Sequence, residues 1–566
     1  MKSKKIMTVL LSVVLVSAVA LSGCGNSSAS NSGNSSTALD KDQHLNIEIP
    51  TADIQTLDSS KGTDGYSAYV LMETMEALAR DEVKNGKDTM VPAGATSWTT
   101  SPDGLTWTFH LRKSNWSDGK PVTADQYVYA LRRAVDPNTA SEYEYLLSGA
   151  GIVNVDAVNS GKMPLDKLGV SAPDENTLVI KLSHPCAYFE KLLNFKFFIP
   201  LRQDVVEKAG DKYGTTPSNM VFNGPFKITS MVSGDKIELV KNNEYWDKKD
   251  VKLNKVTMRF MSDANTMLNA LESGEIDSAD TNQPAWINKL KSSGKFNYLS
   301  GPTAANSYIS FNNKDSNKLL TNAKIREAIS LAIDRNDYLK TIGHGIGVAS
   351  YNWIPSVIQA GNVSYRSQVN VSLKNVKEDP KKLFQEGLKE LGMSTDLSKV
   401  VLHDEEAGTD DRHKQEGDYL ISVFKQKLGV TLQVDYKEWK QFLQDQSTLN
   451  FEMQSGEMWS ADYNDPMTFM DMWETPAAAT TNGFSDPNYD KLIEEAKVEK
   501  DQTKRIALFK QAEQLLLIKD AAIAPTYSTN ESIFVAKYVK GVETPAFSAS
   551  SPRNIEFKYA YISGKK

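Results

Sequence analysis

Cysteine is nearly missing from this chain of 566 residues, which contains Cys24, Cys186 and no other cysteine. If Cys24 is modified, as the N-terminus described below predicts, one thiol remains and no internal disulfide can form, so a packed core has to hold the fold. Cys186 lies in the stretch HPCAYF and is expected to be a small buried apolar residue. A reactive thiol is disfavoured, because only His184 nearby could activate it.

The chain also lacks the patterns of several function classes. Its formal charge is −7 and it has no basic block of the kind that binds nucleic acid, so no nucleic-acid partner is expected. It has no G-x-S-x-G elbow, Walker A loop or H-E-x-x-H motif, so we expect no catalytic residues and no enzyme. The length allows two or three lobes with an extensive core.

The N-terminus has the layout of a secretory signal. Three lysines within the first five residues precede an apolar run from Ile6 to Leu21, which is short for a membrane span. Leu21-Ser22-Gly23-Cys24 resembles the lipobox of bacterial lipoproteins, in which the cysteine carries a diacylglycerol. We therefore expect a signal peptide over 1–23, then a lipidated Cys24 and a flexible tether over 24–42 that is rich in Ser, Asn and Gly. The alternative is an ordinary signal peptide with a chance cysteine.

These features predict a protein held by its lipid at the extracellular face of the cell membrane. Removing the signal peptide removes its three lysines, so the formal charge of the mature chain becomes −10. No later apolar run is long enough to span a bilayer.

Helix and strand patterns alternate along the rest of the chain. Leu105 to Arg112 alternates apolar and polar residues as a half-buried strand does. Thr123 and Gln126 form a capping box that predicts a helix through Val135. Further predicted elements are strands over Thr177–Leu182 and Lys236–Val240, a helix over Asn322–Leu339, and a helix capped by Thr503. This mixture indicates an α/β fold of several lobes.

One acidic segment could be read as a metal cluster. It contains His403-Asp404-Glu405-Glu406, followed by Asp410, Asp411 and His413. The spacing matches no common zinc or calcium motif, so we expect no metal and no cofactor. The favoured interpretation is an acidic loop between a strand over Lys399–Leu402 and a helix from about Gln415.

The stretch WSADYNDP, Trp459 to Pro466, places Asp462 between Ala461 and Tyr463, where partial burial is expected. An unpaired buried carboxylate is costly, so a cation should meet it. That cation could belong to the protein or arrive with a ligand, and Asp462 could also cap a helix or turn ahead of Pro466.

Leu105 to Pro137, LTWTFHLRKSNWSDGKPVTADQYVYALRRAVDP, closely resembles the signature segment of the extracellular solute-binding proteins of family 5. These are the oligopeptide-, dipeptide- and nickel-binding components of ABC importers. The resemblance continues through NGPFKI (223–228), NNEYWD (242–247), LESGEID (271–277), REAISLAIDR (326–335) and DPNYDKLI (486–493). WSADYNDP resembles the oligopeptide-binding branch in particular.

The resemblance implies a two-lobed periplasmic-binding-protein type II fold with an extra domain in the first lobe. Two crossing segments, near Thr303 and Asn530, would join the lobes. The first lobe would comprise 43–79, 201–303 and 530–566, the extra domain 80–200, and the second lobe 304–529. The protein would act as a monomer that binds oligopeptides with a free N-terminus and delivers them to the permease subunits of an ABC transporter.

The resemblance also implies a binding site. Asp462 matches an acid that meets the α-ammonium of a bound peptide, a cation that peptides share whatever their side chains. His413 matches a histidine able to meet a peptide carboxylate. The other residues implied to line the site are Trp459, Tyr463, Tyr143, Trp439, Tyr308, Thr63, Asp64 and Gly65. Ordinary packing remains the alternative for each of them.

Two departures from the family pattern are visible. Relatives with this motif carry an arginine six residues before the acid, where this chain has Gly456, which favours longer peptides. Ala305 and Ser460 occupy positions that form a disulfide in some relatives. Three rivals remain open: the same fold binding nickel or haem, a receptor for a peptide pheromone or signal, and an exported peptidase.

Overall fold

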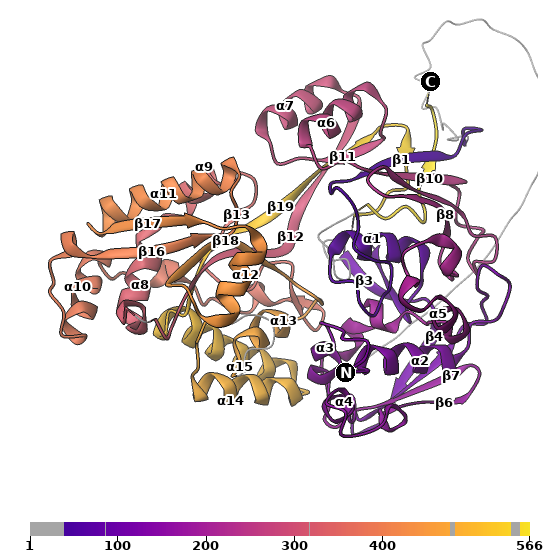
Figure 1. Ribbon diagram of the computed structural model, residues 1–566, viewed down its shortest axis with the longest axis horizontal. Coiled ribbons are helices and arrows are strands. Elements are labelled where there is room, and N and C mark those ends of the chain that lie inside the picture. The colour runs from indigo at the N-terminus through magenta and orange to yellow at the C-terminus, as the bar shows by residue number, and fades with distance from the viewer. Residues whose placement is uncertain (1–38, 85–86, 316, 476–481, 545–554, 566) are drawn as a thin grey trace, which may run out of the picture. The chain divides into compact units, whose positions relative to one another are not determined.

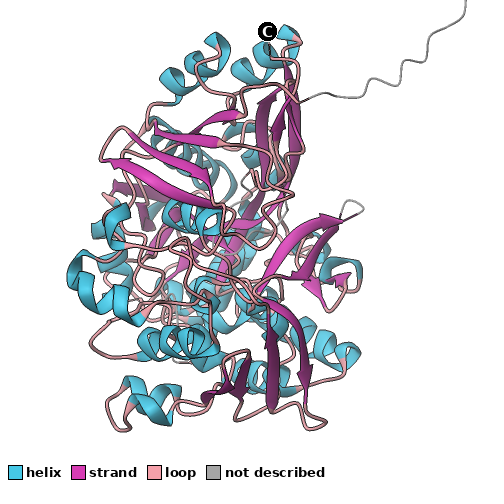
Figure 2. Ribbon diagram, turned by 90° about the vertical axis from the view of Figure 1, so that its right-hand side faces the viewer, coloured by secondary structure: helices cyan, strands magenta, loops and turns pink. Residues whose placement is uncertain are grey.

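The computed structural model describes residues 39–84, 87–315, 317–475, 482–544 and 555–565 (Figure 1). The predicted signal peptide, Cys24 and nearly all of the predicted tether lie outside the described residues. Figure 2 shows the mixture of helices, strands and loops that the alternating pattern predicts. No helix in the described ranges is long and apolar enough to cross a bilayer.

The first sheet runs in the order β1-β10-β9-β8. Its strands are β1 (His44–Ile49), β10 (Lys255–Phe260), β9 (Lys236–Lys241) and β8 (Phe226–Val232). β1 pairs parallel to β10, and the other pairs are antiparallel. Alternate residues of β1 (Leu45, Ile47 and Ile49) are buried, which is the period of two that a strand with one covered face requires. Helix α1 (Gly65–Thr74) packs against β8.

A second four-stranded sheet, in the order β4-β5-β7-β6, contains the predicted strand of the signature segment. Its strands are β4 (Ala95–Thr100), β5 (Thr106–Leu111), β7 (Thr177–Lys181) and β6 (Val170–Asp174). All neighbouring strands are antiparallel. Helix α2 (Ala124–Val135) packs against β6 and β7. The strand predictions over 105–112, 177–182 and 236–240 are confirmed.

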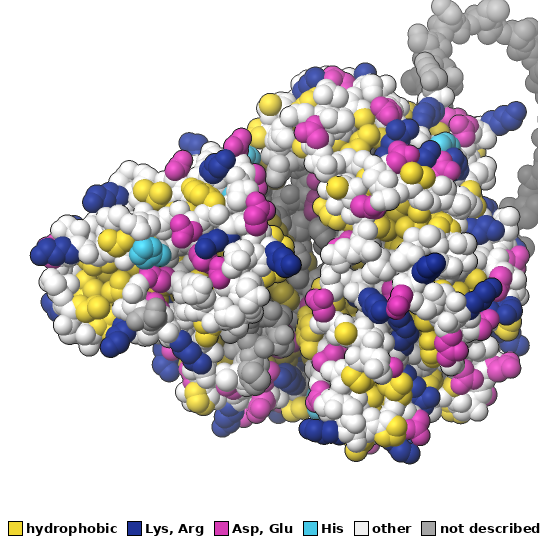
Figure 3. Space-filling model, in the orientation of Figure 1, with side chains coloured by type: hydrophobic (Ala, Val, Ile, Leu, Met, Phe, Trp, Pro, Cys, Tyr) yellow, Lys and Arg dark blue, Asp and Glu magenta, His cyan; other side chains and the backbone are white. Residues whose placement is uncertain are grey.

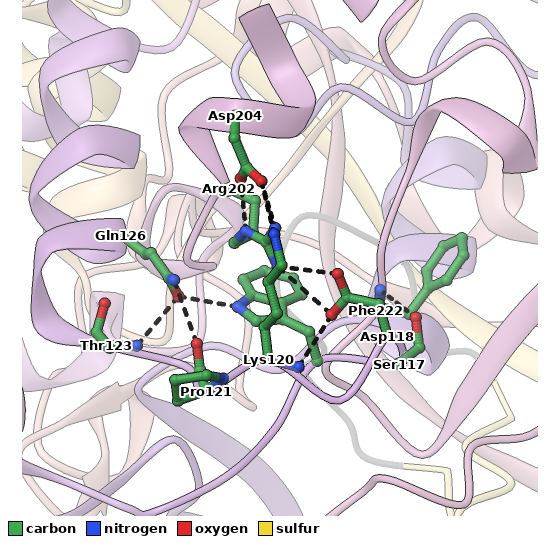
Figure 4. A network of polar contacts seen from close by, with 10 residues as sticks. Ser117, Asp118, Lys120, Pro121, Thr123, Gln126, Arg202, Asp204 and Phe222 are labelled. Atoms are coloured by element: carbon green, nitrogen blue, oxygen red, sulfur yellow. Dashed lines mark hydrogen bonds and ion pairs between the residues drawn. The ribbon is translucent and has the colours of Figure 1, made fainter. Parts of the chain in front are cut away.

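Figure 4 shows the turn chemistry that follows β5. The side-chain oxygen of Gln126 accepts hydrogen bonds from the backbone N–H of Thr123, at 3.0 Å, and from the indole of Trp116, at 2.9 Å. The predicted capping box is therefore present. Arg202, the N-cap residue of helix α5 (Gln203–Ala209), pairs with Asp118 and Asp204 in the same network.

The largest sheet has the order β11-β19-β12-β18-β16-β17, with β13 paired to β19. Its strands are β11 (Ser278–Asp280), β19 (Ile523–Ala536), β12 (Phe296–Phe311), β18 (Met453–Ser460), β16 (Val401–Glu406), β17 (Thr431–Tyr436) and β13 (Val348–Ala349). The long antiparallel strands β12 and β19 lie at its centre and pair Pro302 with Asn530. Ala305 and Ser460 are direct partners across β12 and β18.

Smaller strand pairs complete the sheets of the described chain. They are β2 (Ala79–Lys84) with β3 (Lys87–Pro92), β14 (Gln359–Ala360) with β15 (Val363–Ser364), and β20 (Val539–Lys540) with β21 (Tyr561–Ile562).

The remaining helices of the described chain mostly cover the large sheet or follow its strands, and the first two of them pack near α2. They are α3 (Tyr145–Gly149), α4 (Val155–Asn159), α6 (Ala264–Ser273), α7 (Pro284–Ser293), α8 (Ala323–Ala332), α9 (Arg335–Thr341), α10 (Pro380–Glu390), α11 (Asp411–Lys427), α12 (Trp439–Thr448), α13 (Met467–Met470), α14 (Pro487–Val498) and α15 (Gln502–Gln514). One apolar core (including Ile309, Phe311, Phe384, Leu420 and Phe424) joins β12 to α8, α10 and α11.

Three local predictions were wrong. The helix predicted over 322–339 is two helices, because the chain breaks at Ile333 and the Asp334 side chain caps α9. The acidic segment at 403–406 is not a loop, because β16 continues through Glu406. The last predicted helix is capped by Asp501, and Thr503 lies inside its first turn.

Candidate functional site

The WSADYNDP segment turns sharply at the end of β18. Beyond Ser460, the N–H of Ala461 still pairs with the carbonyl of Ala304 at 2.9 Å, and the N–H of Asp462 then donates to the hydroxyl of Thr468 at 3.1 Å. α13 begins directly after Pro466. Asp462 therefore lies in a turn held at both ends and is not a helix cap, because no amide of α13 donates to its side chain.

Asp462 is almost fully buried, with 8% of its surface exposed. The hydroxyl of Tyr145 donates to one carboxylate oxygen at 2.9 Å. Within the described residues, no lysine, arginine or histidine nitrogen lies within 4.0 Å of that carboxylate. Burial raises the pKa of Asp462 to about 6, while the Tyr145 hydrogen bond and the charge of Lys196 act in the opposite direction.

The other acid of the motif has an internal partner. The two terminal nitrogens of the Arg505 guanidinium donate to Asp465, each at 2.7 Å, and both side chains are buried. The guanidinium also donates to the carbonyl of Ala496 and lies over the ring of Phe509. Asp465 is therefore a structural residue, and its pairing leaves Arg505 unavailable to Asp462.

Aromatic side chains surround the turn. Tyr143 and Tyr145 are stacked with ring centroids 5.9 Å apart. Tyr143 therefore packs on the tyrosine whose hydroxyl donates to Asp462. Tyr463 is stacked on Tyr188 at 4.8 Å, and its hydroxyl donates to Asp471 at 3.2 Å. Only 1% of Tyr463 is exposed, so this predicted site residue supports the turn and has no free face for a ligand.

A loop from the N-terminal part of the chain is tied to the same aromatic group. The ammonium of Lys196, in a short helical turn η3 (Lys196–Phe198), donates to the carbonyl of Gly62 and lies 4.1 Å from the centroid of the Tyr143 ring. The predicted loop residues follow Gly62 directly. Thr63 donates to Gln55 at 3.2 Å.

Asp64 is the N-cap of α1, and its carboxylate accepts the backbone N–H and the hydroxyl of Ser67. Gly65 is the first residue of α1. The Asp64 carboxylate is therefore already engaged, and the loop offers a ligand chiefly its backbone groups.

His413 lies in a second group of residues, at the start of α11. One ring nitrogen is 2.6 Å from the carboxylate of Asp410, and the other is 3.0 Å from the guanidinium of Arg412. Arg412 pairs with buried Glu416. His413 is thus held in place, with Arg412 as a cation beside it that the sequence did not indicate.

Gly456, where relatives carry an arginine, lies against this second group. Its φ is +82°, and a Cβ at this position would lie 1.9 Å from an oxygen of Glu406. Glu406 is fully buried and shares the hydroxyl of Ser455 with Asp404. Burial, together with the neighbouring charges of Glu416 and Asp404, raises the pKa of Glu406 well above its usual value. The space that an arginine would need is therefore filled.

The remaining predicted site residues differ in exposure. Trp439, the first residue of α12, is 53% exposed and stacks on Phe442. Trp459 is half-buried, and its indole donates to the carbonyl of Thr468 at 2.8 Å. Tyr308 is buried, with its ring edge-to-face against Trp353, so it has no face for a ligand.

The structure therefore brings together part of the predicted site. Contacts link Asp462, Tyr143 and the loop that begins at Gly62, but no described contact joins His413 or Trp439 to Asp462. Sequence reasoning missed Tyr145 as the partner of Asp462, and it missed Lys196. A lysine inside the apolar stretch NFKFFIP was the available signal for a buried cation.

The segment from His403 to His413 does not assemble into a metal cluster. In the described residues, no group of three or more His, Cys, Asp or Glu side chains is arranged to hold a metal ion.

Burial raises the pKa of the Cys186 thiol to about 12, which agrees with its prediction as an apolar residue. On the face shown in Figure 3, acidic and basic side chains are interspersed, and none of the described residues there form a basic patch.

With this geometry in place, similarity to known proteins identifies the class. Residues 89–481 match the family described as bacterial extracellular solute-binding proteins, family 5, and the chain belongs to this family. The chain is 33% identical to the periplasmic oligopeptide-binding protein OppA of Salmonella typhimurium, over 90% of this chain and 91% of that protein. It is 30% identical to the oligopeptide-binding protein OppA of Bacillus subtilis, over 97% of this chain and 99% of that protein.

Solved structures support the same fold. The OppA of Haemophilus influenzae in complex with the peptide RPPGFSPFR superimposes with a TM-score of 0.78, at 28% identity, over 93% of this chain and 100% of that one. The substrate-binding domain of an oligopeptide ABC transporter from Bacillus anthracis gives a TM-score of 0.77 at 32% identity, over 93% and 100%. The predicted family and the predicted two-lobed type II fold are confirmed.

Proposed function

We propose that this protein is a receptor that binds oligopeptides through their free N-terminus and delivers them to an ABC transporter. The observation that carries the proposal is the Asp462 carboxylate, which is buried, bonded to the Tyr145 hydroxyl and without a cation within 4.0 Å among the described residues. The α-ammonium of a peptide is a cation that does not depend on the peptide's sequence. It would complete the pairing that burial of Asp462 requires.

In this proposal the peptide lies in extended form between two lobes. The first lobe comprises 43–79, 201–303 and 530–566, with 80–200 as its extra domain, and 304–529 form the second. Backbone groups of the peptide pair with backbone groups of the protein, as an added strand does. Its side chains occupy hydrated pockets, of which exposed Trp439 forms one wall.

Around the peptide's N-terminus, Tyr143 and Trp459 supply aromatic walls, and the 62–65 loop supplies backbone carbonyls. Tyr145 orients the carboxylate of Asp462 toward its guest. Tyr463 and Tyr308 act from behind by holding the turn and β12 in place. Arg412 is a cation beside His413, which lies against Gly456, and the carboxylate of a peptide long enough to reach this group would bind there.

Transport follows from hinge closure. Closing the lobes buries the peptide, and the closed form docks on a permease, whose partner ATPase supplies the energy. The chain itself performs no chemistry. Lipid on Cys24 would keep the receptor at the extracellular face of the membrane, and the tether over 24–42 would let it reach the permease.

Isothermal calorimetry with matched peptides tests the proposal. A mixed pool of free peptides should bind with micromolar or tighter affinity, and the same peptides acetylated at the N-terminus should bind at least about 100-fold more weakly, because they lack the cation that meets Asp462. Equal affinity for the free and acetylated pools would remove the role given to Asp462. Incubation with the labelled peptides should leave them uncleaved, and cleavage would favour a peptidase.

A further inference from the structure

Lys196 is a buried cation that the proposed binding mode does not use. It has 6% of its surface exposed and lies between Phe195 and Phe197, which are buried as well. Transfer of an ammonium into such surroundings is costly unless acceptors and negative charge surround it. The carbonyl of Gly62 is its hydrogen-bond acceptor, and the face of Tyr143 lies 4.1 Å away.

Three carboxylates from different segments act on this ammonium. Asp462 has the largest effect, followed by Asp64 and Glu142. Asp64 caps α1, and Glu142 is exposed. Asp462 is therefore the one of the three carboxylates that is buried and does not cap a helix. Burial lowers the pKa of Lys196 to about 8, and the three carboxylates oppose that shift, so the ammonium is protonated at neutral pH.

Contacts connect Lys196 to Asp462 through two rings. The ammonium lies over Tyr143, Tyr143 stacks on Tyr145, and the Tyr145 hydroxyl donates to Asp462. Lys196 is nevertheless not an ion-pair partner of Asp462, because no pair within 4.0 Å joins them. One ammonium among three carboxylates leaves an excess of negative charge, so a second cation can enter.

We propose that Lys196 is a resident cation of the peptide site, which keeps Asp462 ionised while the site is empty and holds the Gly62 loop beside it. This inference rests on the proposed function. The ionised carboxylate is the form that an ammonium needs, because a neutral acid would first have to release its proton. Lys196 is a positioning residue, since it acts on the guest through Asp462 and the loop.

The titratable groups around the pair come from several elements. Tyr145 of α3 and Lys196 of η3 act on Asp462, and the charge of Asp462 acts on Asp471 of η10 (Asp471–Trp473). Burial raises the pKa of Asp471 to about 7, so it ionises in a neighbouring range of pH. Variant Asp471→Asn therefore serves as a control for any titration assigned to Asp462.

The pH dependence of peptide affinity tests the inference. Wild-type affinity should fall below pH 6, where Asp462 becomes protonated. In Lys196→Met the midpoint of this fall should rise by about one pH unit, because the cation that favours the ionised form is gone. Lys196→Arg keeps the charge and should keep the wild-type midpoint. Loss of packing alone would weaken binding equally at every pH and leave the midpoint unchanged.

Proton release on binding gives a second readout that uses only folded protein. Calorimetry at pH 6.5 in two buffers of different ionisation enthalpy measures the protons released per peptide. We expect about a quarter of a proton for the wild type and about three-quarters for Lys196→Met. Asp471→Asn removes the neighbouring titration and should not raise the proton release as Lys196→Met does. Lys196→Gln replaces Lys196→Met if the latter does not fold.

The outcomes separate the two proposals. If the wild type binds free and acetylated peptides equally, the proposed function fails. If the wild type prefers free peptides but Lys196→Met keeps the wild-type midpoint and proton release, the role of Lys196 is overturned and the function stands.

Discussion

Asp462 and Asp465 lie three residues apart in one turn, and both carboxylates are almost fully buried. Arg505 donates to both oxygens of Asp465 at 2.7 Å, whereas Asp462 receives one hydroxyl from Tyr145 at 2.9 Å. The carboxylate of Asp465 thus has a cationic partner, whereas the carboxylate of Asp462 has none within 4.0 Å among the described residues. An acid with an internal cation stabilises the fold, and an acid without one is held ready for a cation from outside.

The largest expected effect concerns Asp465. Asp465→Asn leaves the Arg505 guanidinium buried without a counter-charge, so the free energy of unfolding should fall by about 3–5 kcal/mol. Urea denaturation followed by fluorescence measures this loss. The double variant Asp465→Leu with Arg505→Met removes both charges and should regain much of it. If Asp465→Asn has the same free energy of unfolding as the wild type, Asp465 is not a structural residue.

The matching change at Asp462 should leave stability intact and remove binding. Burial raises the Asp462 pKa from 3.8 to about 6, and this shift corresponds to about 3 kcal/mol that a guest ammonium can recover. Asp462→Asn should therefore weaken the binding of free peptides by about 100-fold, as measured by calorimetry. Its free energy of unfolding should equal or slightly exceed that of the wild type, because a buried charge is removed.

N-acetylated peptides provide the control for this variant. They lack the ammonium, so Asp462→Asn should change their affinity little. An equal loss of affinity for free and acetylated peptides would mean that the substitution damaged the site and did not remove a charge partner.

The sequence alone predicts elements that depend on neighbouring residues. The alternation over 105–112 and the capping box at Thr123 predict local elements, because they depend on neighbours a few residues away. The break at Ile333 was missed, since the apolar period continues across it, although an aspartate before Arg335 is a typical cap.

The partners of the two acids depend on contacts between distant segments. Tyr145 and Asp462 are 317 residues apart, and Arg505 follows Asp465 by 40 residues. No local pattern contains such pairings. The resemblance to family 5 pointed to Asp462 as the ligand's partner, but it did not indicate that Lys196 would lie nearby, because the segments that carry the resemblance do not include residue 196.

The pH at which peptide binding is lost depends on the ionisation of Asp462. Asp462 has a pKa of about 6 in the fold, above that of an unfolded aspartate, so its ionisation lowers stability as pH rises from about 4 to 6. Peptide binding has the opposite sign, because it needs the ionised form. Affinity should be highest near pH 7, between the pKa of Asp462 and the pKa of about 8 of a peptide ammonium, and should fall by about 30-fold at pH 4.5. Asp462→Asn should abolish this dependence, and its persistence would assign the titration to another group.

The smallest effect concerns Tyr145, the one hydrogen-bond donor that the Asp462 carboxylate has inside the described protein. Tyr145→Phe removes a hydrogen bond to an ionised group at pH 7 and to a neutral one at pH 4.5, so the free energy of unfolding should fall by about 1.5 kcal/mol at pH 7 and by about half of that at pH 4.5. Denaturation of both proteins at both pH values measures the difference. A loss that is the same at both would mean that the hydroxyl contributes packing and does not respond to the charge of Asp462. The pH-dependent loss would show instead that the fold partly compensates this acid with a neutral donor and leaves the charge itself for the guest.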